Sequence, residues 1–349
     1  MAAVGQRPGW LPSPLAEARQ VVLLVIDGLG WEQLVARPGI APNLASMVGG
    51  PITSVTPTTT ATALSSVVTG SPPAAHGVVG YRVRVAGPDG TDQVLNVLRW
   101  RTAAGDARGF VEPIGFCRVA AFGGQAVPVV SRVEFIGTGF TAAHQQGARD
   151  LGYATPSGMA VEVRRLLAQG EPFVYAYYDG VDKVAHRCGF GEHYDAELRA
   201  ADRLVADLLA LLPPGAGLAV TADHGQVEVG DRLVVLDPAV REGTSLISGE
   251  ARFRWLHTRS GARRDVLDAA GSLYGADSWV ASAEEMLAAG WFGGAMDPIV
   301  RRRIGDVAIV PHAPVGYLDP VDATEFRLVC RHGSLTSAEM LVPLVAASV

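Results

Sequence analysis

Three short apolar runs, each followed at once by an aspartate, constrain the fold of this chain most strongly. The runs and their aspartates are Val21–Ile26 with Asp27, Phe173–Tyr178 with Asp179, and Leu218–Ala222 with Asp223. Continuous runs of β-branched and other apolar residues are typical of strands buried on both faces of a parallel sheet. Because ligands of such sheets bind beyond the carboxyl ends of the strands, these aspartates are candidate site residues.

Helical patterns alternate with these runs. Apolar spacing predicts one helix over Gly158–Ala168 and a second, strongly amphipathic helix over Tyr194–Leu212, which stops before Pro213. This alternation predicts an α/β fold, with helices on both faces of a mostly parallel sheet. With 48% hydrophobic residues, the 349-residue chain has enough apolar side chains for one large core or for a core with an inserted cap.

The segment 241–303 is the candidate for such an insertion. It contains strand-like and helical pieces at Phe253–His257, Arg263–Tyr274 and Ala283–Ala289. We therefore predict that 1–240 and 304–349 form the catalytic core and that 241–303 forms a small α+β cap. The core is expected to end with a strand over Phe326–Cys330, a His-Gly turn and a last apolar segment, Met340–Ala346.

Charge and cysteine content narrow the partners and the compartment. A net charge of −6 argues against nucleic acid as an obligate partner, because a phosphate backbone requires a basic surface. It still allows a small phosphorylated substrate, since bound metal ions can reverse the local field. We expect no membrane span, because no run of eighteen apolar residues occurs in the sequence. We expect no signal peptide, because the N-terminal residues lack a continuous apolar stretch behind a basic start. Three cysteines without CxxC spacing fit a cytoplasmic protein, whose oligomeric state the sequence leaves open.

Carboxylates and imidazoles with metal-ligand spacing lie near these strand ends. Asp182 and His186 are four residues apart, so both side chains can converge on one metal ion. Asp223 and His224 are adjacent after a strand, and His332 follows the C-terminal strand. Each also has an ordinary structural interpretation, such as a helix cap beside a surface histidine. Together with Asp27, they number three aspartates and three histidines, enough for two metal ions with open positions.

A hydroxyl-rich segment, Thr56–Thr62, precedes a short helical pattern that ends at Gly70. The hydroxyls could simply cap this helix. The first backbone N–H groups of a helix also attract an anion, however, so a hydroxyl at this position can meet a phosphoryl group. A threonine of this segment is therefore a candidate nucleophile.

The order and spacing of these segments resemble the alkaline phosphatase superfamily, most closely its nucleotide pyrophosphatase/phosphodiesterase branch. The matching segments are VVLLVIDGLG, APNLASM, TPTTTATALSSVVTGSPPAAHGVVG, YAYYDGVDKVAH, VTADHG and CRHGSLT. The resemblance implies an alkaline phosphatase-like three-layer α/β/α core and metal-dependent hydrolysis of phosphate esters. It implies one zinc ion held by Asp27, Thr60, Asp223 and His224, and a second held by Asp182, His186 and His332.

The resemblance also implies a mechanism. Thr60 would attack phosphorus and form a covalent phospho-threonine that water then hydrolyses, while the N–H of Ala61 would help to hold a non-bridging oxygen. Only the motif frame selects Thr60 over Thr58 and Thr59, which remain alternatives. The three histidines and three aspartates suit zinc, and similar ligands also tolerate manganese.

The chain departs from the phosphodiesterase pattern at Tyr81, where that branch usually has asparagine. The tyrosine could donate a hydrogen bond to a phosphoryl oxygen, stack on a substrate base, or serve only in packing. We expect a phosphodiester or nucleotide pyrophosphate as substrate. The alternative is a phosphomonoester or phosphonate, for which Arg82, Lys183 or Arg187 would supply further positive charge. A phosphosugar mutase, which usually carries a serine nucleophile, and a non-catalytic zinc-binding protein are weaker alternatives.

Three further polar residues lie close to these motifs. His76 is interpreted as a structural hydrogen-bonding residue. His312, which follows an apparent strand, competes with His332 as the last metal ligand. Asp179 could orient a metal-bound histidine.

Overall fold

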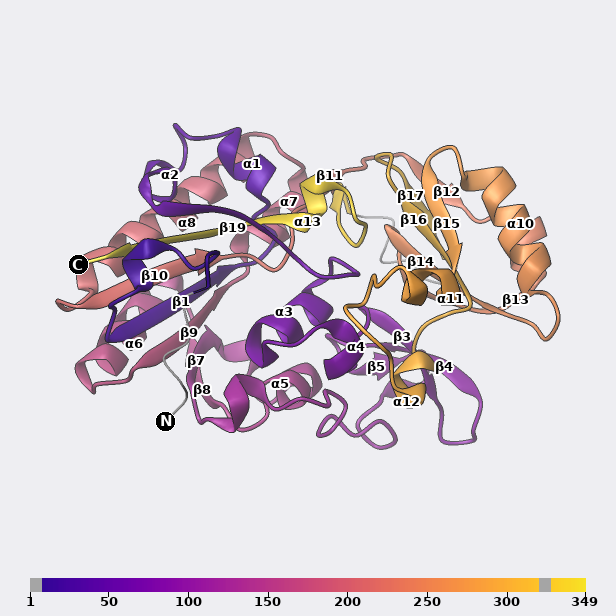
Figure 1. Cartoon of the computed structure of the whole chain (residues 1–349), viewed down its shortest axis with the longest axis horizontal. Coiled ribbons are helices and arrows are strands. Elements are labelled where there is room, and N and C mark those ends of the chain that lie inside the picture. The colour runs from indigo at the N-terminus through magenta and orange to yellow at the C-terminus, as the bar shows by residue number, and fades with distance from the viewer. Residues whose placement is uncertain (1–7, 320–327) are drawn as a thin grey trace.

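A seven-stranded sheet forms the centre of the protein in the computed structural model, which describes residues 8–319 and 328–349 (Figure 1). Its strands, in spatial order, are β2 (Val48–Thr53), β19 (Leu341–Ser348), β10 (Ala216–Thr221), β1 (Gln20–Ile26), β9 (Phe173–Tyr178), β7 (Pro128–Arg132) and β8 (Arg149–Tyr153). The strands from β10 to β8 are parallel, whereas β19 is antiparallel to both β10 and β2. The sheet is therefore mostly parallel, as predicted.

Helices cover both faces of this sheet and give it three layers (Figure 1). One face carries α1 (Trp31–Val35), α2 (Pro42–Ser46), α6 (Pro156–Ala168), α7 (Gly180–Cys188) and α8 (Glu192–Leu211). The other face carries α3 (Thr60–Thr69), α4 (Pro73–His76) and α5 (Gly139–His144). The two predicted helices correspond to α6 and α8, which begin two residues earlier than the patterns indicated.

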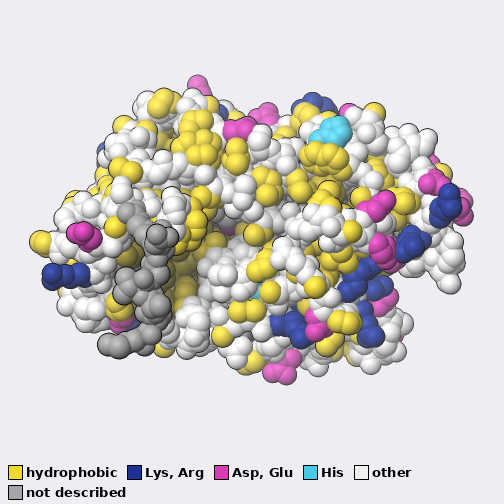
Figure 2. All heavy atoms as spheres, viewed as in Figure 1, with side chains coloured by type: hydrophobic (Ala, Val, Ile, Leu, Met, Phe, Trp, Pro, Cys, Tyr) yellow, Lys and Arg dark blue, Asp and Glu magenta, His cyan; other side chains and the backbone are white. Residues whose placement is uncertain are grey.

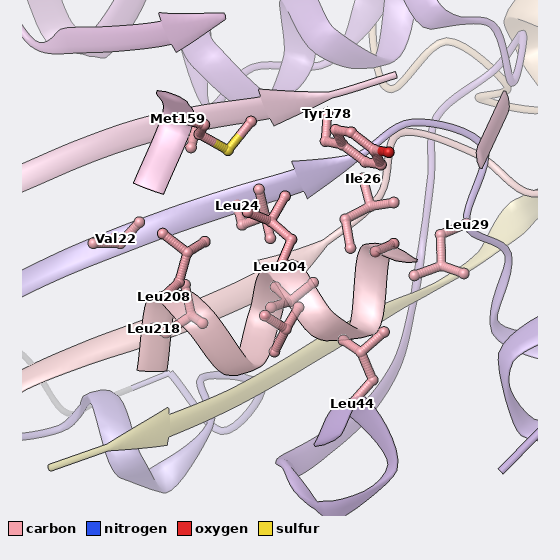
Figure 3. Packing of buried hydrophobic residues seen from close by; sticks show 14 of the residues in the cluster. Val22, Leu24, Ile26, Leu29, Leu44, Met159, Tyr178, Leu204, Leu208 and Leu218 are labelled. Carbon is pink, nitrogen blue, oxygen red and sulfur yellow. The ribbon is translucent and has the colours of Figure 1, made fainter. Parts of the chain in front are cut away.

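Alternation of side chains along β1 explains why both faces are apolar. Leu24 and Ile26 pack in one buried cluster, and Val25 packs in the cluster on the opposite face. Figure 3 shows Leu24 beside Leu204 and Leu208 of α8. Burying each such side chain stabilises the fold by about 1.5–3 kcal/mol, so the central strands hold their carboxyl ends at fixed positions.

A second, four-stranded sheet lies at the other end of the molecule (Figure 1). Its spatial order is β13 (Thr244–Glu250), β14 (Phe253–Thr258), β16 (Val307–Pro311) and β15 (Ser278–Ser282). The same part of the chain contains α9 (Pro238–Arg241), α10 (Arg263–Tyr274), α11 (Ala283–Ala288) and α12 (Pro298–Arg301), of which α9 and α10 pack with this sheet in one buried cluster. The pieces predicted within 241–303 thus form a mixed α and β unit, and β16, beyond residue 303, pairs with β14 and β15.

Smaller sheets connect the remaining segments. One joins β3 (Arg82–Ala86), β4 (Asp92–Asn96), β5 (Arg101–Thr102) and β6 (Gly105–Asp106), and two others pair β11 (Val227–Glu228) with β18 (Cys330–Arg331) and β12 (Leu233–Val235) with β17 (Gly316–Leu318). Residues 326 and 327 of the predicted strand Phe326–Cys330 lie outside the described residues. A last short helix, α13 (Ser337–Met340), precedes β19.

On the face shown in Figure 2, basic side chains gather toward the end with the second sheet, with acidic side chains among them. Among the residues that the structure describes, no helix combines the length and apolarity needed to cross a membrane.

Candidate active site

The carboxyl ends of β1, β9 and β10 bring the predicted aspartates together. β1 lies between the other two strands, with Ile26 opposite Tyr178 and Val25 opposite Thr221. Asp27 and Asp223 therefore follow neighbouring strands at one edge of the sheet. Asp182 and His186 lie one turn apart on α7, which begins directly after β9, and Nε2 of His186 is 3.3 Å from Oδ1 of Asp182.

Two groups of potential metal ligands meet at this edge. Ligand atoms of Asp27, Asp223 and His224 lie within 4.8 Å of one another, as do those of Asp182, His224 and His332. Nε2 of His224 is 3.5 Å from Oδ1 of Asp27 and 3.4 Å from Oδ2 of Asp223. The rings of His224 and His332 stack with their centroids 3.6 Å apart, so His224 lies between the two groups.

All three imidazoles are oriented by backbone carbonyls. Nδ1 lies 2.7 Å from the Cys330 carbonyl in His186, 2.8 Å from that of Thr58 in His332, and 3.1 Å from that of Gly225 in His224. A carbonyl only accepts, so Nδ1 carries the proton and Nε2 has a free lone pair. Burial and the neighbouring His224 and His186 also lower the pKa of His332 well below its ordinary value, which keeps that ring neutral.

The two buried carboxylates each leave one oxygen without a hydrogen bond. Oδ1 of Asp223 accepts from the backbone N–H groups of Gly28 and His224, both at 3.0 Å, and Oδ2 of Asp27 accepts from the Tyr177 hydroxyl. Oδ2 of Asp223 and Oδ1 of Asp27 have no partner. Burial raises the pKa of Asp27 well above its ordinary value, and the nearby Asp223 and Asp182 raise it further.

These side chains fit divalent cations. Burying an unpaired carboxylate oxygen is unfavourable, whereas a metal ion would satisfy it and stabilise the ionised form. The donors are carboxylate oxygens and unprotonated imidazole nitrogens, the types that zinc and manganese accept. Gln226 supports Asp182 from behind, with its amide Nε2 donating to Oδ1 at 2.9 Å.

Thr60 is the threonine that faces these ligands. It is the first residue of α3, and its Oγ1 is 3.1 Å from Nε2 of His224. The Thr58 hydroxyl instead donates to the Ser334 carbonyl at 2.7 Å and accepts from the backbone N–H of Gly333 at 3.0 Å. Thr59 is the N-cap residue of α3. The Thr58 hydroxyl is therefore occupied by hydrogen bonds to the loop that follows His332.

Two cavities open beside Thr60. The smaller, of about 210 Å³, extends toward α5, and the larger, of about 540 Å³, extends toward Tyr81 and His332. Tyr81 also lies next to one of the two asparagines of the chain, because Nδ2 of Asn96 donates to its hydroxyl at 2.6 Å. Leu98, Phe135, Asp182 and Lys183 line both cavities.

The three cations considered from the sequence lie in different surroundings. Lys183 lines both cavities and forms an ion pair with Asp179. Arg82 lies 3.4 Å from Asp319, and neither Arg82 nor Arg187 is among the described residues that line these two cavities.

Among the described residues, neither group of potential metal ligands includes Asp179, His76 or His312. Asp179 accepts from Arg132 at 2.7 Å and forms an ion pair with Lys183, and the hypothesis that it orients a metal-bound histidine stays a prediction. His76 bonds the Ser66 hydroxyl at 2.8 Å and accepts from the Val78 N–H at 3.1 Å, consistent with a structural role. His312 packs against Trp279, with ring centroids 5.2 Å apart, at the end of the second sheet.

Sequence analysis missed Tyr177, Gln226 and the residues of α5. The alternation along β9 could have identified Tyr177, because its neighbour in the parallel register is Val25, two residues before Asp27. By contrast, the segment that contains α5 carries no pattern that relates it to the motifs.

The sequence model of the type I phosphodiesterase / nucleotide pyrophosphatase family matches residues 21–317. A comparison with curated proteins gave no match.

Solved structures share the fold at low sequence identity. Murine ectonucleotide pyrophosphatase / phosphodiesterase 5, an inactive threonine-to-alanine variant in complex with AMP, has a TM-score of 0.71 and 16% identity over 95% of this chain and 88% of that chain. The human protein of the same name has a TM-score of 0.71 and 15% identity, with 94% and 88% covered. Phosphonoacetate hydrolase from Sinorhizobium meliloti 1021, in complex with phosphonoformate, has a TM-score of 0.67 and 18% identity, with 95% and 91% covered.

Proposed function

Because the chain belongs to the type I phosphodiesterase / nucleotide pyrophosphatase family, we propose that it cleaves phosphodiester or nucleotide pyrophosphate bonds through a covalent phospho-threonine. The family resemblance inferred from the motifs is confirmed, and with it the assignment to phosphate ester hydrolases. The observation that carries the finer proposal is the position of Thr60. Its hydroxyl lies at the N-terminus of α3, beside Nε2 of His224 and next to both ligand groups.

Two divalent metal ions are the proposed cofactors, zinc by expectation and manganese as the alternative. Asp27, Thr60, Asp223 and His224 would hold one ion, and Asp182, His186 and His332 the other. When bound, the ions would lower the pKa of the attacking hydroxyl and balance the charge of the phosphoryl oxygens. The unpartnered carboxylate oxygens and the backbone-oriented imidazoles support this assignment.

The residues of the chain would carry the reaction in two steps. The Thr60 hydroxyl gives up its proton and its oxygen forms a bond to phosphorus, while the bond to the leaving alcohol or phosphate breaks and the leaving oxygen takes up a proton. Water then attacks the same phosphorus and loses a proton, and the bond to Thr60 breaks as the threonine oxygen takes a proton back. The N–H of Ala61, in the first turn of α3, has no partner within the helix and would hold a non-bridging oxygen. Tyr81 lines the larger cavity beside Thr60 and is the expected second donor.

A monoester or phosphonate is the second candidate substrate, and Lys183 is the observation that favours it. These substrates carry more negative charge than a diester, and Lys183 is the cation of the three considered that lines both cavities. The fold similarity to a phosphonoacetate hydrolase fits the same possibility. The proposal retains a small phosphorylated substrate and, as an untested expectation, a cytoplasmic location.

A hydrolysis panel tests the proposal. The zinc-loaded protein is assayed on an aryl diester, the matching aryl monoester, a nucleoside triphosphate and phosphonoacetate. We expect the highest kcat/KM for the diester or the nucleotide. A tenfold preference for the monoester or for phosphonoacetate would select the second candidate. In that case Lys183→Met should reduce the preferred activity much more than it reduces diester hydrolysis.

A further inference from the structure

The smaller cavity beside Thr60 has the size and lining of a binding site for one ring. It measures about 210 Å³, and a cavity of about 150 Å³ can hold a benzene ring. Its apolar lining is Leu64, Leu98, Phe135, Phe140 and Tyr177. The cavity therefore has room for a single substituted six-membered ring, whereas a whole nucleoside would need the larger cavity.

His144, in α5, lines this cavity and has a buried ring nitrogen, Nε2, that lacks a hydrogen-bond partner. Its ring stacks on Phe140, with centroids 3.8 Å apart and an interplanar angle of 9°, and its Nδ1 lies 2.7 Å from the Phe140 carbonyl. Nδ1 must therefore carry the proton. Burial lowers the pKa of His144 to about 4, so the ring is neutral and Nε2 can only accept. His144 is 3% exposed, and Nε2 has no hydrogen-bond partner.

Gln145 adds a second acceptor. It is 8% exposed, lines the same cavity, and its Oε1 has no partner. The hydroxyls of Thr138 and Thr141 are already engaged, because Thr138 donates to Thr141 at 3.0 Å and Thr141 donates to the Phe135 carbonyl at 2.7 Å. Buried acceptors of this kind discriminate strongly between ligands, because one that offers no donor leaves them unpaired.

We propose that this cavity binds a small aromatic substituent on phosphorus and that His144 and Gln145 select rings with a hydrogen-bond donor at the far end. This inference rests on the proposed function for the placement of phosphorus at Thr60. It assigns the protein's specificity for the ester group to residues of α5, a helix on the opposite face of the sheet from α7. Phe135, Phe140 and Leu98 contact the ring, and Thr60 marks the end where phosphorus lies.

Equilibrium binding tests this assignment without turnover. Zinc-loaded protein is titrated in a calorimeter with 4-aminophenylphosphonate and with 4-methylphenylphosphonate, which match in size and differ in the donor. We expect the amino compound to bind about tenfold more tightly, the effect of one buried hydrogen bond. His144→Phe keeps the aromatic stack and removes the acceptor, so it should bring this ratio close to one without weakening the methyl compound. Gln145→Met should reduce the ratio, and Gln146→Met, at the exposed neighbour, should leave it unchanged.

Two results would overturn the inference. One is equal binding of the two phosphonates to the unsubstituted protein. The other is a ratio that persists in both the His144→Phe and Gln145→Met proteins, or falls only because both ligands weaken together. Thr60→Ala separates this inference from the proposed function, because it should abolish hydrolysis and keep the binding ratio. A protein that shows the ratio but hydrolyses no ester would refute the proposed function alone.

Discussion

Thr58 and Thr60 are two positions apart, yet their hydroxyls have different surroundings. Thr60 lies beside His224, whereas the Thr58 hydroxyl forms two buried hydrogen bonds with the loop after His332. We expect Thr60→Ala to lower kcat/KM by about a thousandfold or more, because the nucleophile is lost. Its unfolding midpoint should change little.

Thr58→Val is the matched comparison. It keeps the side-chain shape and removes both hydrogen bonds, so it should lower the free energy of unfolding by about 1–3 kcal/mol. At a temperature where this variant is folded, most of the activity should remain. Loss of activity in Thr58→Val, together with a mild effect of Thr60→Ala, would show that our proposal names the wrong nucleophile.

Tyr177 is a second residue whose effect can be isolated. Its hydroxyl donates to Oδ2 of Asp27, and this bond fixes the carboxylate that the proposal assigns to a metal ion. Tyr177→Phe should weaken metal binding by about 10–100-fold, as loss of a group that orients a metal ligand typically does. Competition with a chelator measures this change. Tyr274→Phe, which removes a hydroxyl in the second sheet unit, should leave metal affinity unaltered.

The candidate ligand residues could be proposed from the sequence because each follows a strand or lies one helical turn from another candidate. Strand ends and i, i+4 spacing marked Asp27, Asp182 and Asp223 as candidates, and the family resemblance supplied the ligand set. Tyr177 and His144 could not be found in the same way. Tyr177 matters through its hydrogen bond to Asp27, and His144 through a ring nitrogen that has no partner, and both features follow from the folded structure rather than from local pattern.

At the scale of elements, the apolar runs predicted β1, β9 and β10 well, because strands buried on both faces have continuous apolar sequence. The second sheet was harder to delimit. Its strand β16 lies at Val307–Pro311, beyond the predicted insertion 241–303, because pairing with β14 and β15 is nonlocal. We retain the division into a catalytic core and an inserted unit as a proposal.

A buried ion pair joins the second sheet to the loop that carries His332. Arg252 lies between β13 and β14 and contacts Glu339 of α13 at 2.7 Å, with both side chains fully buried. Glu339 also accepts from the Ser334 backbone N–H at 3.0 Å. Arg252→Met should lower the free energy of unfolding by about 3–5 kcal/mol, because it leaves a buried carboxylate without its partner. Denaturant titration measures this loss.

The exposed pair Arg264 and Asp268 supplies the control. Arg264→Met should change the free energy of unfolding by no more than about 0.5 kcal/mol. The double variant Arg252→Met with Glu339→Leu should regain part of the stability lost by Arg252→Met, since no unpaired charge remains. If Arg252→Met proved as mild as Arg264→Met, the pair would not fasten this loop.

At the scale of the whole molecule, the candidate site follows from one arrangement: parallel strands that end together and helices that return the chain to the same edge. The sequence identity of 15–18% to the solved neighbours is too low to infer from them which substrate this chain uses. The fold still places β1, β9, β10 and the C-terminal loop at one edge, and this is why residues from 27 to 332 meet in a single site.

Metal removal should make the stability of the whole protein depend on pH in a defined direction. Burial raises the pKa of Asp27 and Asp223 above the ordinary value of 3.8. Their contribution to the stability of the metal-free protein is therefore fully present below that value and is lost as pH rises through the raised values. Metal ions require the ionised carboxylates and neutral imidazoles, so zinc should bind more tightly as pH rises.

The zinc-induced increase in Tm should accordingly grow between pH 5 and pH 8. Free zinc at a thousandfold excess over its dissociation constant adds about 4 kcal/mol of stability, and protons compete for the same ligands at the lower pH. Thermal unfolding of chelated and zinc-loaded protein, measured across this range, gives the difference directly. Asp27→Asn should keep the fold and reduce the zinc-induced increase at pH 8, whereas Asp92→Asn, at an exposed carboxylate in β4, should not. A zinc effect that is independent of pH, or that Asp27→Asn leaves intact, would mean that zinc binds elsewhere on the protein.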